Sequence, residues 1–236
     1  MSRRIFRRIF PLHVPKHPFD ARYGVDTSGL IGNKDLVTGH ANDEHSVAYY
    51  GTAPSLFAGI LDHWIGTLAE RSLSPADFTL IDIGCGKGRV VMLASETPFQ
   101  EIIGVELSPQ LAWIAQQNLG IWNAAPHPCA RLSIVQDDAF DLAIPESPVL
   151  IYLFNPFGAV LVQRLVEHLL TLAATRTTLV DLLYVHPVHA DLVATIPGVH
   201  LQWDGQIPFS PEDTAADAFR DRSERCCIYR IEGGTS

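Results

Sequence analysis

Residues 80–90 read Leu-Ile-Asp-Ile-Gly-Cys-Gly-Lys-Gly-Arg-Val and join a short apolar run to three closely spaced glycines. The apolar residues predict a buried strand, and the glycines predict a tight turn from which a helix begins. Such a turn lets the backbone approach a ligand, and the N–H groups at the helix start favour a polar or anionic group. Together with Glu106 further along, the pattern predicts a pocket for an adenosine-bearing cofactor.

The spacing of the glycines indicates which cofactor. A nicotinamide or flavin site uses G-x-G-x-x-G, because the pyrophosphate lies across the helix start. Here the spacing is G-x-G-x-G, formed by Gly84, Gly86 and Gly88 with Cys85 inside it, and Asp82 stands two residues before the first glycine. A carboxylate at that place would repel a pyrophosphate. It suits S-adenosylmethionine, which carries a sulfonium and an ammonium but no phosphate, so Asp82 is predicted to face the methionine part.

Two further strands end on acidic residues. The strand at 102–106 ends on Glu106, which is predicted to accept hydrogen bonds from both ribose hydroxyls, with Leu107 beside it. The next strand, at 132–136, is followed by an acidic pair and a small residue. Asp138 is predicted to accept a hydrogen bond from the adenine amino group, and the Ala139 amide to serve a ring nitrogen. Asp137 could hold the same role, since paired acids at a strand end are also ordinary turn residues.

A fourth strand, at 149–154, runs into Asn155-Pro156-Phe157-Gly158 at the edge of the predicted sheet where open α/β folds bind ligands. This segment is predicted to hold the substrate. The alternative is a turn that ends the strand, with Asn-Pro chosen for its backbone geometry.

Together these motifs resemble the class I, seven-strand S-adenosylmethionine-dependent methyltransferases, from about Leu80 to the C-terminus. The resemblance implies that the glycine loop holds the methionine part, the second strand's acid the ribose and the third strand's acid the adenine. Asn155-Pro156-Phe157 resembles the Asn-Pro-Pro-Tyr-type motif of the family's amino-group methylators. In that motif the amide and a backbone carbonyl orient the target nitrogen, and the ring packs on the substrate. Phe157 stands where the second proline is expected.

Strands alternate with helices along the chain. Strands are predicted at 79–83, 102–106, 132–136, 149–154 and 178–185, and apolar residues fall at helical spacing over 54–68. This alternation predicts a doubly wound α/β fold with a mostly parallel sheet and helices on both faces. Two strands at 199–203 and 225–231, joined by a loop, are predicted to complete a seven-stranded sheet as a C-terminal antiparallel hairpin.

Residues 1–50 are rich in Gly, Pro, Asp and His and are predicted to form an irregular extension, or lid, ahead of a cofactor-binding domain at 51–236. Thr52 or Ser55 is predicted to lie near the methionine carboxylate, although either is equally credible as a helix cap. His186 follows the fifth strand at the same ligand edge. Four residues before the first long helix are candidates for accepting a proton from an amine nucleophile: Asp43, Glu44, His45 and Tyr50.

The composition limits the setting of the protein. The chain of 236 residues has no apolar run long enough for a spanning helix, and its four cysteines form no C-x-x-C pair. We therefore expect a cytoplasmic protein without a transmembrane segment, a metal site or disulfides. The net charge of −9 argues against a broad nucleic-acid groove, although the first 22 residues hold six basic residues and one acidic residue. That tail is predicted to be frayed, the alternative being contact with RNA or an anionic membrane.

The sequence therefore predicts an S-adenosylmethionine-dependent methyltransferase that acts on a nitrogen of a protein side chain, a nucleobase or a small amine. Its catalytic residues are predicted to be Asn155, Pro156, Phe157 and Tyr50, and Asn155 is also predicted to contact the cofactor. A small-molecule or protein acceptor is favoured over nucleic acid. Two alternatives remain, namely a nicotinamide-dependent oxidoreductase, which the glycine spacing disfavours, and a binding module that holds the cofactor without turnover.

Overall fold

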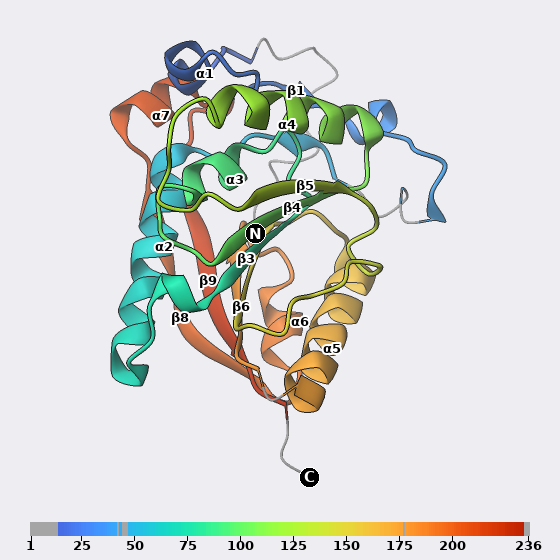
Figure 1. Ribbon diagram of the computed structural model, residues 1–236. Coiled ribbons are helices and arrows are strands. Elements are labelled where there is room, and N and C mark those ends of the chain that lie inside the picture. The colour runs from blue at the N-terminus through green and yellow to red at the C-terminus, as the bar shows by residue number, and fades with distance from the viewer. Residues whose placement is uncertain (1–13, 42, 44–46, 177, 234–236) are drawn as a thin grey trace.

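A computed structural model describes residues 14–41, 43, 47–176 and 178–233 and contains a seven-stranded sheet between layers of helices (Figure 1). The strand order is β5-β4-β3-β6-β7-β9-β8. The first five strands in that order are parallel, and β9 runs antiparallel to both of its neighbours. This arrangement confirms the predicted α/β fold with an antiparallel hairpin after the parallel strands. The strands are β3 (Thr79–Ile83), β4 (Glu101–Glu106), β5 (Leu132–Gln136), β6 (Val149–Phe154), β7 (Val180–Val185), β8 (Val199–Pro208) and β9 (Ser223–Ile231).

Two hydrophobic cores, one on each face of the sheet, hold the helices. Successive residues of a strand point to opposite faces, so Leu80 packs into one core and Ile81 into the other. The first core receives side chains from α1 (Pro18–Tyr23), α2 (Pro54–Leu68), α3 (Arg89–Ala94) and α4 (Pro109–Trp122). The second receives side chains from α5 (Ala159–Arg176) and α6 (Ala190–Ala194). Since both faces are covered, the central strands carry the continuous apolar runs seen in the sequence.

Several element boundaries differ from the sequence prediction. β4 begins at Glu101 rather than at residue 102, β7 at Val180 rather than at residue 178, and β9 at Ser223 rather than at residue 225. β8 continues to Pro208 instead of ending near Trp203. The segment between β8 and β9, predicted as a loop, contains the short helix α7 (Pro211–Ala216). This helix forms because the Ser210 hydroxyl accepts a hydrogen bond from Asp213 N at 3.0 Å and Pro211 occupies the first helical position.

The N-terminal extension is more ordered than predicted. It contains α1, the 3₁₀ turn Asn33–Asp35, and an antiparallel pair formed by β1 (Leu30–Ile31) and β2 (Tyr49–Tyr50). α1 begins because the ring of His17 accepts a hydrogen bond from Phe19 N and Pro18 follows it. The basic tail at residues 1–13, together with Glu44 and His45, lies outside the described residues. The division of the chain at residue 50 stays a prediction.

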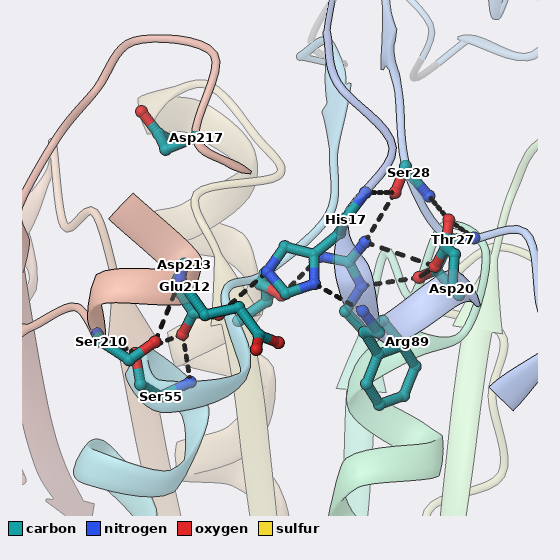
Figure 2. Close-up of polar contacts among 12 residues, drawn as sticks. His17, Asp20, Thr27, Ser28, Ser55, Arg89, Ser210, Glu212, Asp213 and Asp217 are labelled. Atoms are coloured by element: carbon teal, nitrogen blue, oxygen red, sulfur yellow. Dashed lines mark hydrogen bonds and ion pairs between the residues drawn. The ribbon is translucent and has the colours of Figure 1, made fainter. Parts of the chain in front are cut away.

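A cluster of polar side chains joins the extension to α2 and α7 (Figure 2). His17 Nε2 donates to Asp213 Oδ1 at 2.9 Å, and both the hydroxyl and the N–H of Ser55 donate to the other oxygen of Asp213. Burial alone would raise the pKa of Asp213, but the hydrogen bonds from His17 and Ser55 prevail and lower it to about 2. Ser55 therefore bonds to α7, and its hydroxyl is not turned to the first cavity described below.

This cluster predicts a specific loss of stability in acid. A carboxyl whose pKa is lowered by folding stabilises the protein above its ordinary pKa of 3.8, and that stabilisation disappears as the pH falls to about 2. The contribution is about 2 kcal/mol. Urea unfolding of Asp213→Asn should show less stability than the parent at pH 7 and a smaller further loss below pH 4. Glu212→Gln, at an exposed site on the same helix, should behave as the parent does.

In the part of the chain that the structure describes, no helix has the length and apolar character needed to cross a membrane. The parallel strands β3, β4, β5 and β6 all end at one edge of the sheet, and the functional residues gather there.

Candidate active site

The turn after β3 brings the chain close to the end of β6. Gly84, Gly86 and Gly88 have φ values of 73°, 56° and 83°, in the left-handed region that glycine adopts without strain. The N–H groups of Gly84 and Cys85 both donate to Val105 O of β4 at 2.9 Å. A Cβ on Gly84 would lie 3.1 Å from the Cβ of Pro156, so the glycine turn and the fourth-strand motif are in contact.

A first cavity lies above this turn. It is lined by the carboxyl ends of β3, β4 and β6, the acidic pair after β5, and part of the N-terminal extension. Of the predicted cofactor residues, these line it: Thr52, Asp82, Gly84, Cys85, Glu106, Leu107, Asp138 and Ala139. Three predicted cofactor residues do not line it. Gly86 N donates to Glu106 Oε2, Gly88 precedes the first residue of α3, and Asn155 lines a second cavity. The structure therefore gathers most of the predicted cofactor residues around one cavity.

Asp82 is a buried carboxylate without a hydrogen-bond donor among the described residues. Only 4 % of its surface is exposed, and it lines the first cavity. Burial, followed by the nearby charge of Glu106, raises the pKa of Asp82 well above its ordinary value. A buried carboxylate with no donor is costly, so the site favours a ligand that brings a positive charge to it.

Glu106 ends β4 on the other side of the glycine turn. Its Oε2 accepts a hydrogen bond from Gly86 N and its Oε1 from Ser108 N, each at 2.8 Å. Burial raises the pKa of Glu106, against the lowering effect of these two bonds. Each oxygen keeps a second acceptor position, and two such positions suit a pair of neighbouring hydroxyls. Ser108 also caps α4, as predicted.

The acidic pair after β5 also lines the first cavity. Asp138 Oδ1 accepts a hydrogen bond from Phe140 N at 3.0 Å, and its Oδ2 lies 3.7 Å from His40 Nε2. Asp137 Oδ1 accepts from Asp138 N at 2.9 Å. Both acids and Ala139 line the cavity, so either acid can meet a ligand there.

Asn155 stands between the first cavity and a second one. Its φ of 39° is unusual for a residue other than glycine, and its side chain is buried, with 8 % of the residue exposed. Asn155 Oδ1 accepts a hydrogen bond from Tyr184 OH at 3.0 Å. Asn155 lines the second cavity, whereas the next two residues, Pro156 and Phe157, line the first. The motif therefore forms the wall where the two spaces meet.

The second cavity has a volume of about 700 Å³ and lies between the extension, the ends of β6 and β7, and the segment from α7 to β9. Tyr50, Arg89 and Phe154 line both cavities. A volume of this size suits a small molecule or one side chain of a larger partner.

Two of the predicted proton acceptors are held by other groups. Tyr50 OH donates to Asp217 Oδ1 at 2.9 Å and accepts from Ala218 N at 2.8 Å. Burial raises the pKa of Tyr50, so the phenol remains protonated near neutral pH. Asp43 lines the first cavity but accepts hydrogen bonds from Thr38 and from Gly39 N, which lower its pKa despite burial. This geometry favours Tyr50 as a cavity wall.

The sequence prediction missed two basic residues of the glycine loop. Arg89 is 4 % exposed, and its guanidinium donates to Thr27 Oγ1 at 2.7 Å (Figure 2). The guanidinium also donates to Thr52 O at 3.0 Å. Lys87 Nζ donates to Asp26 Oδ1 at 3.0 Å and to Ser28 O at 2.8 Å. The hydrogen bonds of both side chains therefore connect the extension to the glycine loop that lines the first cavity. The Gly-Lys-Gly-Arg run indicates two basic residues in the loop, but the sequence does not show that their side chains bond to the extension.

Comparison with known proteins identifies the type of domain. Residues 81–179 match the family described as methyltransferase domain. No curated protein sequence matches the chain. An RNA methyltransferase from Salinibacter ruber, solved with S-adenosyl-L-homocysteine, is 18% identical, with a TM-score of 0.45, over 75% of this chain and 92% of that one. The tRNA m1G37 methyltransferase of M. jannaschii is 10% identical, with a TM-score of 0.50, over 79% of this chain and 52% of that one. The chain thus spans about half the length of the latter, and at such identities the likeness concerns the fold alone.

The chain carries a class I S-adenosylmethionine-dependent methyltransferase domain. The protein is accordingly a methyltransferase enzyme with S-adenosylmethionine as its cofactor. The residues present fit that cofactor, because Asp82 offers a buried carboxylate to a cation and the Glu106 carboxylate can accept hydrogen bonds beyond those from Gly86 N and Ser108 N.

Proposed function

We propose that the enzyme transfers the methyl group to a nitrogen atom held beside Asn155, on a protein side chain, a nucleobase or a small amine. The observation that carries this proposal is the position of the Asn155 amide, buried at the wall between the cofactor cavity and the second cavity. An amide and the backbone carbonyl beside it can accept hydrogen bonds from an N–H group and turn its lone pair toward the first cavity.

We assign the first cavity's residues to the parts of the cofactor. Asp82, Gly84 and Cys85 face the methionine part, with Thr52 near its carboxylate. Glu106 and Leu107 face the ribose. Asp138 and Ala139 face the adenine. The support is that all of these residues line one cavity and that the acids follow β3, β4 and β5, which lie side by side in that order.

When bound, the cofactor supplies a methyl group already activated by its sulfonium, so the protein's part is mainly positioning. Asn155 orients the acceptor, Pro156 fixes the backbone at the edge of the glycine turn, and Phe157 closes the apolar wall. Holding the acceptor in line in this way can supply roughly 7–11 kcal/mol of the lowering of the barrier. The net charge of −9 supports a small molecule or a protein as the acceptor over a nucleic acid.

Asn155→Ala tests this proposal. We expect affinity for S-adenosylhomocysteine within about two-fold of the parent and a rate of methyl transfer lower by about 10²–10³-fold, the usual effect of removing one orienting hydrogen-bonding group. The assay follows labelled methyl groups into three pools of acceptors, namely small amines, a basic protein and RNA. Asn123→Ala, at an exposed position after α4, is the control. Full activity in Asn155→Ala, or products methylated on oxygen, would contradict a nitrogen acceptor at this residue.

A further inference from the structure

Asn155 and His186 end neighbouring strands at the same place. Phe154 of β6 pairs with Val185 of β7, so the residues that follow them lie side by side at the edge of the sheet. Adjacent strands are about 4.8 Å apart. Asn155 and His186 also share the left-handed conformation, with φ values of 39° and 49°. Both residues line the second cavity. β7, the strand next to β6, therefore places the imidazole of His186 beside the proposed acceptor site.

Glu224 holds that imidazole in a fixed orientation. His186 N donates to Arg225 O of β9 at 3.0 Å, which brings the next residue along β9, Glu224, beside the ring. His186 Nδ1 lies 3.1 Å from Glu224 Oε1. This hydrogen bond raises the pKa of His186, while burial acts in the opposite direction. None of the described residues bonds to Nε2, so Nε2 is the ring atom that can accept a proton.

The rest of the second cavity suits an organic cation. Its carboxylates outnumber its basic groups, and Arg89 is already paired with Asp20 at 3.7 Å. Aromatic rings line its walls: Tyr50, Phe154, Phe209 and Phe219. Carboxylates together with aromatic faces attract an ammonium group that carries an apolar body.

The amide oxygen of Asn155 can take part in binding an ammonium ion. Asn155 lines the same cavity, and its Oδ1 accepts one hydrogen bond, from Tyr184 OH at 3.0 Å. An amide oxygen has a second acceptor position, to which an ammonium N–H can donate.

We propose that the second cavity binds the methyl acceptor as an organic ammonium ion and that Nε2 of His186, held by Glu224, takes its proton. The N–H bond breaks, the proton moves to Nε2, and the electron pair stays on the acceptor nitrogen as the lone pair that attacks. His186 is then a catalytic residue and Glu224 a positioning residue. This inference rests on the proposed nitrogen acceptor. It adds that the acceptor binds as a cation and that His186 is the base that removes its proton.

Ammonium binding should depend on the protonation of His186. An imidazolium repels an ammonium ion, so affinity should rise as the pH increases through the pKa of His186. Several other charged groups line the same cavity: His17, Arg89, Asp213, Asp217, Asp221 and Glu224. Of these, His17 is the other histidine, and it is bonded through both ring nitrogens to Phe19 N and Asp213. Removal of the His186 imidazole therefore separates its effect from that of His17.

Calorimetry with matched probes tests the inference without turnover. The protein is first saturated with S-adenosylhomocysteine and then titrated with 2-phenylethylamine, 2-phenylethanol and phenylacetate from about pH 5.5 to 8.5. We expect the amine to bind at least ten-fold more tightly than the alcohol at the upper end. The affinity for the amine should decrease as the pH is lowered in the parent and should not change with pH in His186→Gln. In Glu224→Gln the decrease in affinity should occur at a lower pH than in the parent. Glu212→Gln, an exposed carboxylate outside the cavity, should match the parent.

The contrary results separate the two proposals. If S-adenosylhomocysteine binds but the amine shows no preference over the alcohol, or if His186→Gln keeps the pH dependence, this inference is overturned and the cofactor site stands. If the parent does not bind S-adenosylhomocysteine, both fall. A further measurement uses only the parent protein, so its result does not depend on whether the variants fold. Carbon-13 labelling of the histidines should show one imidazole whose pKa decreases when 2-phenylethylamine is added, and no such change would also overturn the inference.

Discussion

Asp82→Asn is expected to weaken the binding of S-adenosylmethionine by about 10–100-fold while it raises the melting temperature of the ligand-free protein. The two effects have one cause, since the Asp82 carboxylate is buried with no donor among the described residues. A charge-assisted hydrogen bond to an ammonium contributes about 1.5–3 kcal/mol to binding. In the empty site the same charge is unpaired and destabilises the fold.

The dependence on pH follows from the direction of the pKa shift. Burial raises the pKa of Asp82 in the folded protein. Below the ordinary pKa range of aspartic acid the carboxyl is protonated in both the folded and the unfolded state, so it does not affect stability. As the pH rises from that range to the raised pKa, the free energy of unfolding decreases. Cofactor affinity should increase over the same interval in the parent and stay level in Asp82→Asn. Calorimetry and thermal unfolding measure the two effects, with the exposed Asp62→Asn on α2 as the control. Unchanged affinity together with a lower melting temperature would show that Asp82 has a structural role only.

Asp181→Ala is expected to lower the free energy of unfolding by about 3–5 kcal/mol, the usual cost of removing one partner from a buried ion pair. Asp181 of β7 is opposite Arg230 of β9 and is completely buried. Its two oxygens accept hydrogen bonds from the Arg230 guanidinium at 2.8 and 2.9 Å, and one also accepts from Trp64 Nε1 of α2 at 2.9 Å. The substitution leaves a buried guanidinium and an indole N–H without partners.

Urea unfolding measures this loss, and a double substitution tests its cause. Asp181→Leu combined with Arg230→Met removes both charges and should recover most of the stability, because two apolar side chains of similar size avoid the unpaired charge. If the double variant is as unstable as Asp181→Ala, the pair is not the source of the effect. Asp204→Ala breaks the exposed pair with Arg225 and should change stability by less than about 1 kcal/mol.

The elements that the sequence predicted well are those whose signal is local. β3, β5 and β6 and the helix at Pro54–Leu68 have the predicted bounds, because apolar periodicity and flanking glycines or prolines define both ends. The end of β3, the acid after β4 and the acids after β5 could be placed at one cavity, because the carboxyl ends of parallel strands share an edge.

The parts that escaped prediction depend on contacts between residues distant in sequence. The pairing of His186 with Glu224 requires that β9 lie next to β7, and the burial of Arg89 requires the extension to fold over it. The conformation of Asn155 and the partner of its oxygen depend on Tyr184 in a neighbouring strand. The spacing of residues along the sequence does not predict these contacts, because each of them depends on which strands become neighbours in the sheet.

The position of β9 has a consequence for how the protein is made. β9 follows β8 in the chain but lies between β7 and β8, so β8 has no partner in the sheet until β9 has been synthesised. Until then Asp181 lacks Arg230 and His186 lacks Glu224. The parallel strands that end at the first cavity pair with one another without β9, whereas the proposed acceptor side requires it. The last strand of the sheet is therefore needed for the acceptor side and not for the pairing of the strands that line the first cavity.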